Sequence, residues 1–491
     1  MVMLKPRAYE EGIASGVGRS VKTSGGPALA FAGLSLAVLL PALGTSIANV
    51  ALPTLAESFG ASFAQVQWIV VAFLLASTIA VVGAGRLGDT IGRRRLLLAG
   101  IVLFTAASAL CAVAPTLWLL IAARALQGLG AAVMMALSMA LVGQTVPRAR
   151  TGGVMGLLGT MSAVGTALGP SLGGLLITGF GWRAIFLINL PLGALAFLLV
   201  RRQLPADGDA EGAGRAGFDR LGTLLLALTL GAYALAMTTG RGGFDLFNAA
   251  LLLAAAVGAG LFVRAEAKAA SPLIDVAMVR DPTLGAGLAA SMLVATVLMA
   301  TLVVGPFYLA RALALDTVLV GAVMSAGPLA AALAGVPAGR MVDRFGGRRM
   351  AVGGLIGVGT GCCLLSVIPA TLGVSGYVVP IVVTTASYAL FQTANNTAVL
   401  AAVAPDRRGV VSGMLALSRN LGLITGASVM GAVFALASRT ADMATADPDA
   451  VAGGMRITFA LAAALIVLAL VVVAGRRDAL PQVRTSSEQQ A

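Results

Sequence analysis

Long apolar runs, separated by short polar connections, follow one another along almost the whole chain. Each run is about 20 residues long, the length that an α-helix needs to cross a bilayer core of roughly 30 Å. Because lipid cannot hydrogen-bond an open backbone, the pattern predicts transmembrane helices. We count fourteen runs, with twelve as the nearest alternative because some runs are closely spaced. The fourteen predicted spans are residues 28–50, 64–85, 95–114, 117–142, 152–177, 183–200, 220–239, 247–265, 284–309, 317–339, 349–371, 376–402, 409–437 and 454–475.

The overall composition agrees with this pattern. Hydrophobic residues make up 58% of the chain and charged residues 11%, whereas a soluble domain has roughly 45–50% apolar and about 25% charged residues. The sequence therefore predicts an all-α polytopic membrane protein.

The distribution of basic residues explains the net charge of +13. Most of the 33 lysines and arginines fall in the two termini and the even-numbered connections between spans. The exceptions are Arg183, Arg241, Arg311, Arg439 and Arg456 in odd-numbered connections, and Arg124 and Arg419 within spans. This asymmetry follows the positive-inside rule and places both termini in the cytoplasm. The basic excess thus indicates topology and contact with anionic lipid, and it does not indicate a nucleic-acid partner.

The residues that usually carry enzyme chemistry are scarce. The chain contains no histidine, and its cysteines, Cys111, Cys362 and Cys363, lie within predicted spans. Their spacing suits neither a disulfide framework nor a metal site, and no Ser-His or Cys-His nucleophile can be assembled. We therefore expect no catalytic residues, no metal and no cofactor, and an enzyme or sensor is the least favoured function.

An internal repeat divides the chain into two halves. Residues 85–95, GRLGDTIGRRR, return as residues 339–349, GRMVDRFGGRR, and glycines of the fifth span recur in the thirteenth. Two six-helix bundles, spans 1 to 6 and 9 to 14, would then flank an inserted pair of helices. The predicted divisions are a cytoplasmic tail (1–27), an N-terminal bundle (28–200), a linker with two additional helices (201–283), a C-terminal bundle (284–475) and a second cytoplasmic tail (476–491).

Two halves of the same orientation, with a substrate site between them, are typical of major facilitator transporters. GRLGDTIGRRR resembles the signature that this family carries between its second and third helices. The resemblance implies a conformational latch in which an aspartate lies near a helix N-terminus and arginines. The candidate latch residues are Gly85, Asp89, Gly92, Arg93, Arg94, Asp343 and Arg348. Alternatively, Gly92 makes the turn and the arginines only anchor the topology.

The fourth span carries an arginine within RALQGLGAA. Arg124, Gln127, Gly128 and Ala131 share one helix face by their spacing, and an arginine inside a membrane segment indicates a functional site. The stretch resembles a drug-transporter motif, which implies that Arg124 takes part in proton coupling, with Asp89 as a candidate acid. The alternative is an arginine that snorkels to the interface.

The fifth span resembles the antiporter motif of the same family. The matching positions are Gly156, Gly165, Gly169, Pro170, Gly173 and Gly174. The copy in the thirteenth span has Ala427 in place of the proline and Met430 in place of Gly173. Glycines four residues apart also favour ordinary close helix packing, which is the alternative for many of them.

TSIANVALP (45–53) and GWRAIFLINLPLG (181–193) resemble signatures of the fourteen-span drug:proton antiporters, a family of bacterial multidrug and antibiotic exporters. That family usually has an aspartate just before the first signature, where this chain has Gly44. With the predicted boundaries, no carboxylate lies at mid-membrane. Neutral or anionic amphiphiles are therefore favoured over lipophilic cations, which need a carboxylate to offset desolvation.

Several polar side chains within spans could line a substrate pocket. They are Asn49, Trp68, Gln127, Gln392, Asn395 and Asn396. The alternative is that these amides hydrogen-bond neighbouring helices and hold them together.

The sequence thus predicts a multi-pass transporter of the bacterial cytoplasmic membrane. We expect it to export drug-like organic molecules by alternating access in exchange for protons. The alternative is an uncoupled facilitator or importer of a small organic solute. The expected partners are the lipid bilayer, an amphiphilic substrate and protons, and the family resemblance implies a monomer.

Overall fold

The computed structural model describes residues 27–145, 148–205, 207, 219–238, 246–269, 281–403, 408–438 and 446–475. The predicted tails before Pro27 and after Gly475 lie outside these residues. All regular secondary structure in the described part of the chain is helical, as predicted.

The helices in the first half of the chain and the inserted pair are α1 (Pro27–Val50), α2 (Leu52–Phe59), α3 (Phe63–Ile91), α4 (Arg93–Val113), α5 (Leu117–Thr145), α6 (Arg148–Phe180), α7 (Ala184–Leu187), α8 (Asn189–Gln203), α9 (Arg220–Thr238) and α10 (Leu246–Glu266). Those of the second half are α12 (Pro282–Phe307), η1 (Tyr308–Ala312), α13 (Thr317–Phe345), α14 (Gly347–Val367), η2 (Ala370–Leu372), α15 (Gly373–Ala401), α16 (Arg408–Thr425), η4 (Gly426–Met430), α17 (Gly431–Ala437) and α18 (Pro448–Ala474). The segments η1 and η4 are π-helical, and η2 is a single 3₁₀ turn.

Each of the fourteen predicted spans coincides with a helix or a helix pair. Thirteen described helical stretches are long and apolar enough to cross a membrane, and the seventh span is represented by a shorter apolar helix, Leu221–Ala236. The fourteen predicted spans therefore agree with the described helices, but several boundaries differ. Helix α3 continues to Ile91, so most of the signature stretch is helical and only Gly92 interrupts it. The thirteenth span is interrupted by η4, and the sixth is split into α7 and α8.

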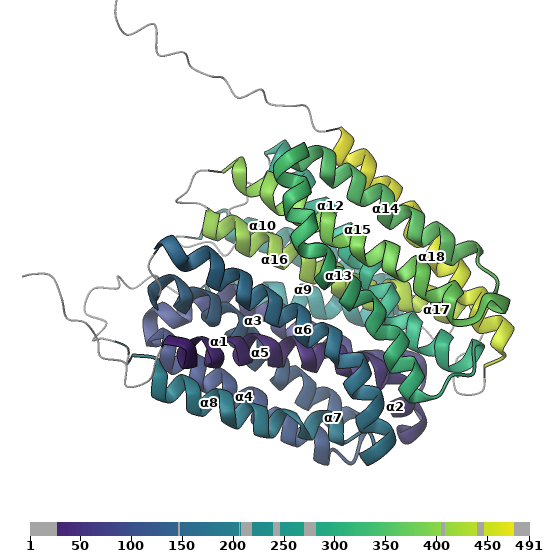
Figure 1. The fold of residues 1–491 in the computed structure, drawn as a ribbon, viewed down its shortest axis with the longest axis horizontal. Helices are drawn as coiled ribbons and strands as arrows, with labels where there is room; N and C mark the ends of the chain where they lie inside the picture. Colours follow the sequence, from purple (N-terminus) through teal and green to yellow (C-terminus); the bar gives the residue numbers. More distant parts are fainter. Residues whose placement is uncertain are drawn as a thin grey trace, which may run out of the picture.

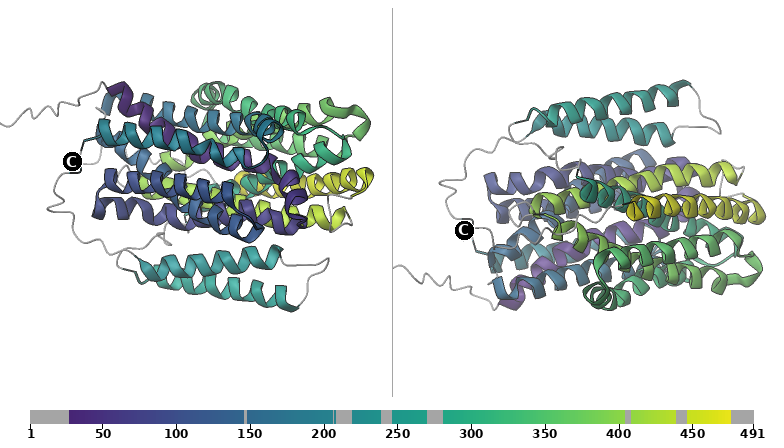
Figure 2. Two further views of the ribbon diagram at one scale, coloured as in Figure 1. Left: turned by 90° about the horizontal axis from the view of Figure 1, so that it is seen from below. Right: turned by 90° about the horizontal axis from the view of Figure 1, so that it is seen from above.

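Two groups of helices face each other (Figure 1). In the first half α1 packs on α6 and α8, while α5 packs on α3 and α4; in the second half α15 packs on α13 and α14, and α12 packs on α16 and α18. The most extensive contact between the groups joins α6 to α13. Helices α9 and α10 pack mainly on each other and lie at one side of the bundle, as Figure 2 shows.

The two ends of the bundle are distinguished by the turns and helix starts that they hold. We call the end that holds the α3–α4 and α13–α14 turns, at Gly92 and Gly346, the Gly92 end. The opposite end, where α3 and α13 begin, is the α2 end.

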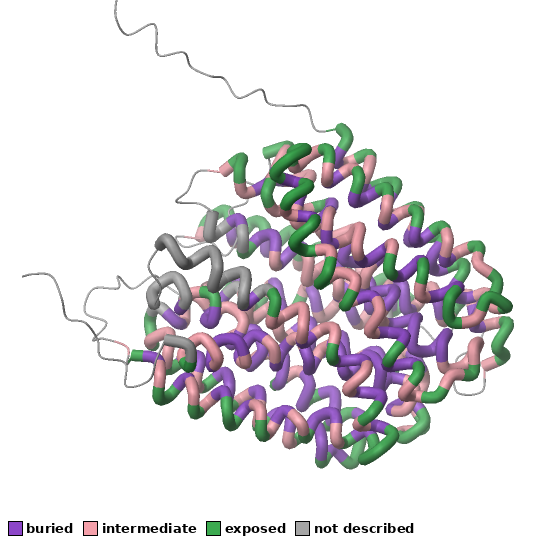
Figure 3. The backbone as a smooth tube through the Cα atoms, in the orientation of Figure 1, coloured by how far each residue is buried: buried purple, intermediate pink, exposed green. Residues whose placement is uncertain are grey.

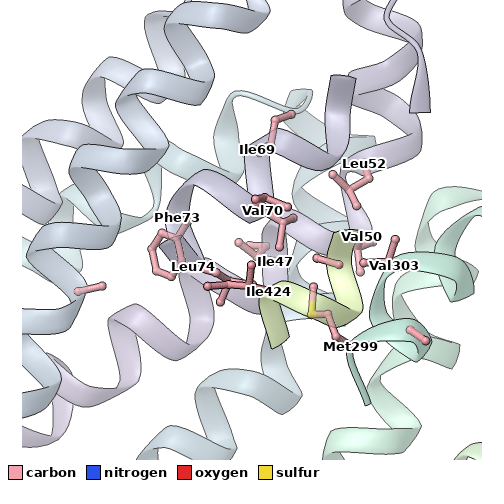
Figure 4. Packing of buried hydrophobic residues seen from close by; sticks show 14 of the residues in the cluster. Ile47, Val50, Leu52, Ile69, Val70, Phe73, Leu74, Met299, Val303 and Ile424 are labelled. Carbon is pink, nitrogen blue, oxygen red and sulfur yellow. The ribbon is translucent and has the colours of Figure 1, made fainter. Parts of the chain in front are cut away.

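Most of the buried apolar residues form one continuous core along the middle of the bundle (Figure 3), and a smaller separate cluster lies around Leu284 and Val411. Near the centre, side chains of both halves point toward one another, with Ile47 and Val70 on one side and Met299, Val303 and Ile424 on the other (Figure 4). Large apolar side chains such as Leu253, Leu333 and Val467 are exposed on the outer faces of their helices. Lipid is the medium in which such faces are stable.

Candidate functional site

Arg124 lies wholly inside the first bundle, with 0% of its surface exposed. Its Nε donates a hydrogen bond to the carbonyl of Ile69 in α3 (3.1 Å), and its Nη1 donates to the carbonyl of Gly44 in α1 (3.3 Å) and to Oε1 of Gln127. The guanidinium also lies 4.4 Å from the ring centroid of Phe73. The interpretation of Arg124 as a snorkelling residue is therefore wrong, because the side chain joins three helices within the bundle core.

The hydrogen bonds of Arg124 continue into α4. Gln127 Nε2 donates to Ser108 Oγ (2.6 Å), whose hydroxyl donates to the carbonyl of Phe104 (2.8 Å). Gly128 lets α5 approach α3 closely, since a Cβ there would lie 2.3 Å from the Phe73 carbonyl oxygen. Gln127, which we considered for a substrate pocket, is thus fully engaged in holding the buried arginine.

The charge of Arg124 has no acidic partner in the described part of the chain. Its Nη2 has no hydrogen-bond partner among the described residues. A Cβ on Gly44 would lie 3.2 Å from the Phe104 ring and 4.0 Å from the Gln127 amide nitrogen. A side chain at this position would therefore lie beside Phe104 and Gln127, next to the group of hydrogen bonds that Arg124 makes with the Gly44 carbonyl and Gln127.

At the signature turn, Gly92 ends α3 and begins α4 with a φ of 105°, a conformation that favours glycine. The carboxylate of Asp207, which follows α8, accepts hydrogen bonds from the backbone N–H groups of Arg94 and Arg95, both at 3.0 Å. The anion at the N-terminus of α4 is therefore Asp207, which satisfies donors that a helix start leaves unpaired. We did not predict Asp207 from the sequence, because nothing local connects it with residues more than a hundred positions earlier.

The arginines of the two turns make the same contact in each half. Arg94 Nη2 donates to the carbonyl of Arg201 at the end of α8, and Arg348 Nη2 donates to the carbonyl of Ala474 at the end of α18 (3.1 Å). Each bond ties the third helix of a half to the sixth, where unpaired carbonyls and the helix dipole favour a cation. The internal repeat thus extends to individual hydrogen bonds.

The remaining latch candidates lie at or near the same two turns. Arg93 Nη1 donates to the carbonyl of Ala140 in its own half (3.5 Å). A Cβ on Gly85 would meet no atom within 4 Å, and Asp343 is exposed. The side chain of Asp89 lies outside the described residues, so its role as a latch remains a prediction.

The glycines of the fifth-span motif lie against two different helices. A Cβ on Gly165 would lie 2.7 Å from the Leu39 carbonyl, and one on Gly169 would lie 2.6 Å from Cβ of Ser46; Gly173 faces the same helix, α1. Gly174 instead faces α13 of the other half, where a Cβ would lie 2.7 Å from the Thr317 carbonyl oxygen. Close packing therefore accounts for these glycines, while the surroundings of Gly156 lie outside the described residues.

Pro170 has a second effect besides packing. Proline lacks an N–H, so the carbonyl four residues earlier, that of Thr166, loses its helical partner. The Ser46 hydroxyl of α1 donates to this carbonyl at 2.7 Å. In the second half, where Ala427 replaces the proline, the helix passes through η4, and the Thr296 hydroxyl of α12 donates to the Gly422 carbonyl at 3.1 Å. Helix α6 therefore lacks one backbone hydrogen bond at Pro170, and the equivalent helix of the second half contains a π-helical segment.

The remaining residues proposed for a substrate pocket are not brought together by any described contact. Asn49 is buried and donates to the Thr45 carbonyl of its own helix at 3.1 Å, and Asn395 donates to the Gly287 carbonyl at 3.0 Å. The Asn395 bond joins α15 to α12, which agrees with the alternative that such amides connect helices. Trp68, Gln392 and Asn396 are half-buried.

Comparison with known proteins identifies a protein family and several similar transporters. The sequence model of the Major Facilitator Superfamily matches residues 34–305 and 286–491. The chain is 33% identical over 81% of its length to the uncharacterized transporter YebQ of Escherichia coli, covering 86% of that protein. It is 32% identical over 79% of its length to the multidrug resistance protein Stp of Mycobacterium tuberculosis, covering 72% of that protein. The riboflavin transporter RibZ of Clostridioides difficile is 29% identical over 82% of this chain and is covered to 87%.

Among solved structures, the fold is similar to that of a bacterial homolog of the human lysosomal transporter Spinster in an inward-facing, unoccupied conformation. The TM-score is 0.66 at 16% sequence identity, and the match covers 91% of this chain and 96% of the other. At this identity the likeness concerns the fold alone.

Proposed function

Since this chain belongs to the Major Facilitator Superfamily and is similar to its multidrug efflux transporters, we propose that it exports drug-like organic molecules across the bacterial cytoplasmic membrane by alternating access. The observation that carries this proposal is the position of the two export motifs in the fold. Arg124 joins α1, α3 and α5 within the first bundle, and Pro170 lies where α6 meets α13 of the other half. Movement of one half against the other would therefore act directly on the fifth-span motif.

The orientation follows from the basic residues. The turns at Gly92 and Gly346 carry clusters of arginine, which remain on the cytoplasmic side of a membrane. The Gly92 end would then face the cytoplasm, with both termini, and the α2 end would face the outside.

The substrate would be neutral or anionic. A lipophilic cation needs a carboxylate to offset its desolvation, and no described carboxylate lies within ion-pair distance of the buried Arg124. An uncompensated guanidinium disfavours a second positive charge nearby.

Proton exchange would need a titrating acid, because a guanidinium does not titrate usefully. Arg124 would tune that acid and would not itself carry the proton. Asp89 or a carboxylate at a span end is the candidate. Asp89→Asn should therefore leave expression near normal and strongly reduce export, and normal export by that variant would remove Asp89 from the mechanism.

A second candidate is an uncoupled facilitator or importer of a small organic solute. The similarity to a protein named as a riboflavin transporter supports it, as does the absence of a carboxylate beside Arg124 among the described residues. Accumulation of a solute by cells that produce the protein, in place of its depletion, would favour this candidate.

The experiment that tests export compares growth of an efflux-deficient bacterium producing the wild type, Arg124→Ala or Arg202→Ala. Arg202 is an exposed arginine at the end of α8 and serves as the matched control. The panel contains neutral, anionic and cationic antibiotics, dyes and biocides. Tolerance to several unrelated neutral or anionic compounds, lost only in Arg124→Ala, supports multidrug export, and protection against one class supports a dedicated exporter. No protection, with the wild type present in the membrane, contradicts export.

A further inference from the structure

At the α2 end, aromatic side chains from the two halves pack against one another. Phe63, at the start of α3, lies 4.8 Å from Phe307 of α12 and 5.5 Å from Phe434 of α17, measured between ring centroids. Both contacts are edge-to-face, and all three rings are buried. Such pairs are favourable beyond the apolar area that they bury. They form a dry layer that joins the first half to the second.

An ion pair joins the halves at the same end. The Arg311 guanidinium in η1 donates a hydrogen bond to the carboxylate of Glu57 in α2. The two side chains are 29% and 55% exposed, respectively. Because water reaches both groups, the pair can separate without leaving a buried charge, unlike an ion pair within the core.

The backbone that carries these residues is irregular. Phe307 immediately precedes the π-helical segment η1, which contains Arg311, and Phe434 follows the π-helical segment η4 by four residues. Ala314, just after η1, has a φ of 52°, a left-handed conformation that is unfavourable for alanine. π-Helical segments within α-helices are frequent at functional sites.

The Gly92 end holds the hydrogen bonds of the two signature turns. The hydrogen bonds of Arg93, Arg94 and Arg348 described above connect helices of the same half. On α13, a Cβ at Gly321 near the α2 end would lie 2.3 Å from the Pro170 carbonyl of the other half, whereas one at Gly339 near the Gly92 end would meet nothing within 4 Å. Direct contact between α6 and α13 is therefore tight toward the α2 end.

We infer that Glu57 and Arg311, together with Phe63, Phe307 and Phe434, form the gate that closes the outer side of the substrate pathway. The inference rests on the proposed alternating-access function. The aromatic layer excludes water. The ion pair between Glu57 and Arg311 holds the two halves together at the same end of the bundle. The aromatic contacts and the ion pair must separate when substrate leaves toward the outside. Because the ion pair is exposed to water, breaking it costs little free energy.

The test uses charge reversal with a distance measurement that needs no substrate. Cys111, Cys362 and Cys363 are first replaced, and spin labels are attached at Phe180→Cys and Leu372→Cys, which lie at the α2 end in different halves and are 81% and 54% exposed. Distances are then measured in lipid nanodiscs for Glu57→Arg, Arg311→Glu and the double variant. Arg183→Glu is the matched control, because Arg183 is exposed at the same end and its described contact is with Trp182 of its own half.

Each single reversal should increase the population of longer distances, by up to about fivefold for a surface pair, and the double variant should restore the parent distribution. The control should leave the distribution unchanged. Unchanged distances in both single variants, no restoration in the double variant, or equal opening by Arg183→Glu would each overturn the inference. If the charge-swap pattern holds but the wild type protects cells against no compound, the proposed export fails and the gate remains.

Discussion

At the residue scale, the missing side chain at Gly44 determines what surrounds the buried charge of Arg124. The Gly44 carbonyl accepts a hydrogen bond from Nη1 at 3.3 Å, and a Cβ at this position would lie 3.2 Å from the Phe104 ring and 4.0 Å from the Gln127 amide nitrogen. The site therefore contains a guanidinium and an amide but, among the described residues, no carboxylate.

Gly44→Asp should consequently change the substrate range. A carboxylate beside Arg124 would neutralise the local charge, and lipophilic cations should become substrates. We expect tolerance of the producing cells to a quaternary ammonium biocide to rise by roughly tenfold, the change that about 1.4 kcal/mol of attraction produces. Gly44→Asn, which has nearly the same shape without the charge, is the control. Equal tolerance in the two variants would contradict the electrostatic explanation.

At the element scale, Pro170 lies inside α6 and removes one of its backbone hydrogen bonds, and α1 supplies a donor in its place. Ser46 Oγ donates to the Thr166 carbonyl at 2.7 Å. Without this donor the carbonyl would be unpaired inside the membrane, where water cannot replace it. The two residues should therefore be coupled in stability.

A double-mutant cycle measures this coupling. Ser46→Ala should lower the free energy of unfolding by about 0.6–1.7 kcal/mol, the range for hydrogen bonds between membrane helices. In a Pro170→Ala background the alanine N–H can bond the Thr166 carbonyl, so Ser46→Ala should cost much less there. Unfolding in mixed micelles, followed by circular dichroism, gives the four values. Additive effects of the two substitutions would show that the Ser46 hydroxyl does not compensate for the proline.

The capping of α4 by Asp207 is a second feature at this scale. Asp207→Ala removes the acceptor of two backbone N–H groups, at Arg94 and Arg95. We expect a loss of about 1 kcal/mol in the free energy of unfolding, as for other helix caps. Asp207→Asn should lose less of the free energy of unfolding than Asp207→Ala. Asparagine also caps helices, but it lacks the charge that favours a helix N-terminus. Thermal unfolding of the three proteins in detergent compares them; equal stability of all three would contradict the role of the cap.

At the scale of the whole molecule, the close approach of α6 and α13 joins the two halves. A Cβ on Gly321 would lie 2.3 Å from the Pro170 carbonyl, and Ser171 Oγ lies 2.6 Å from Ser325 Oγ one turn further along. Because backbone atoms cannot move aside as a flexible side chain can, a larger residue at Gly321 would keep the halves apart at the α2 end.

Gly321→Val should therefore abolish export while each half stays folded. Gly335→Val is the matched control on the same helix, because a Cβ there would meet no atom within 4 Å. Drug tolerance and the distance between labels at the α2 end are measured for both variants. Wild-type export by Gly321→Val would show that transport does not require this close approach.

The sequence alone was sufficient for the properties that depend on local pattern. Apolar runs of membrane length predicted the helices, the repeated GRLGDTIGRRR predicted two related halves, and the spacing of Arg124, Gln127 and Gly128 predicted a shared face. These predictions succeed because hydrophobic length and helical period are set by neighbouring residues. The span boundaries were less accurate where a helix is interrupted by η4 or extends through a polar stretch to Ile91.

Only the tertiary structure decided which distant groups pair. Asp207 caps α4 more than a hundred residues away, Ser46 bonds Thr166, and Glu57 meets Arg311 across the two halves. A single serine or glutamate carries no local sign of such a partner, because the pairing depends on how whole helices pack. The sequence by itself therefore determined the helices, their repeat and the family, while the packing of one half against the other determined the partners of each polar group in the membrane.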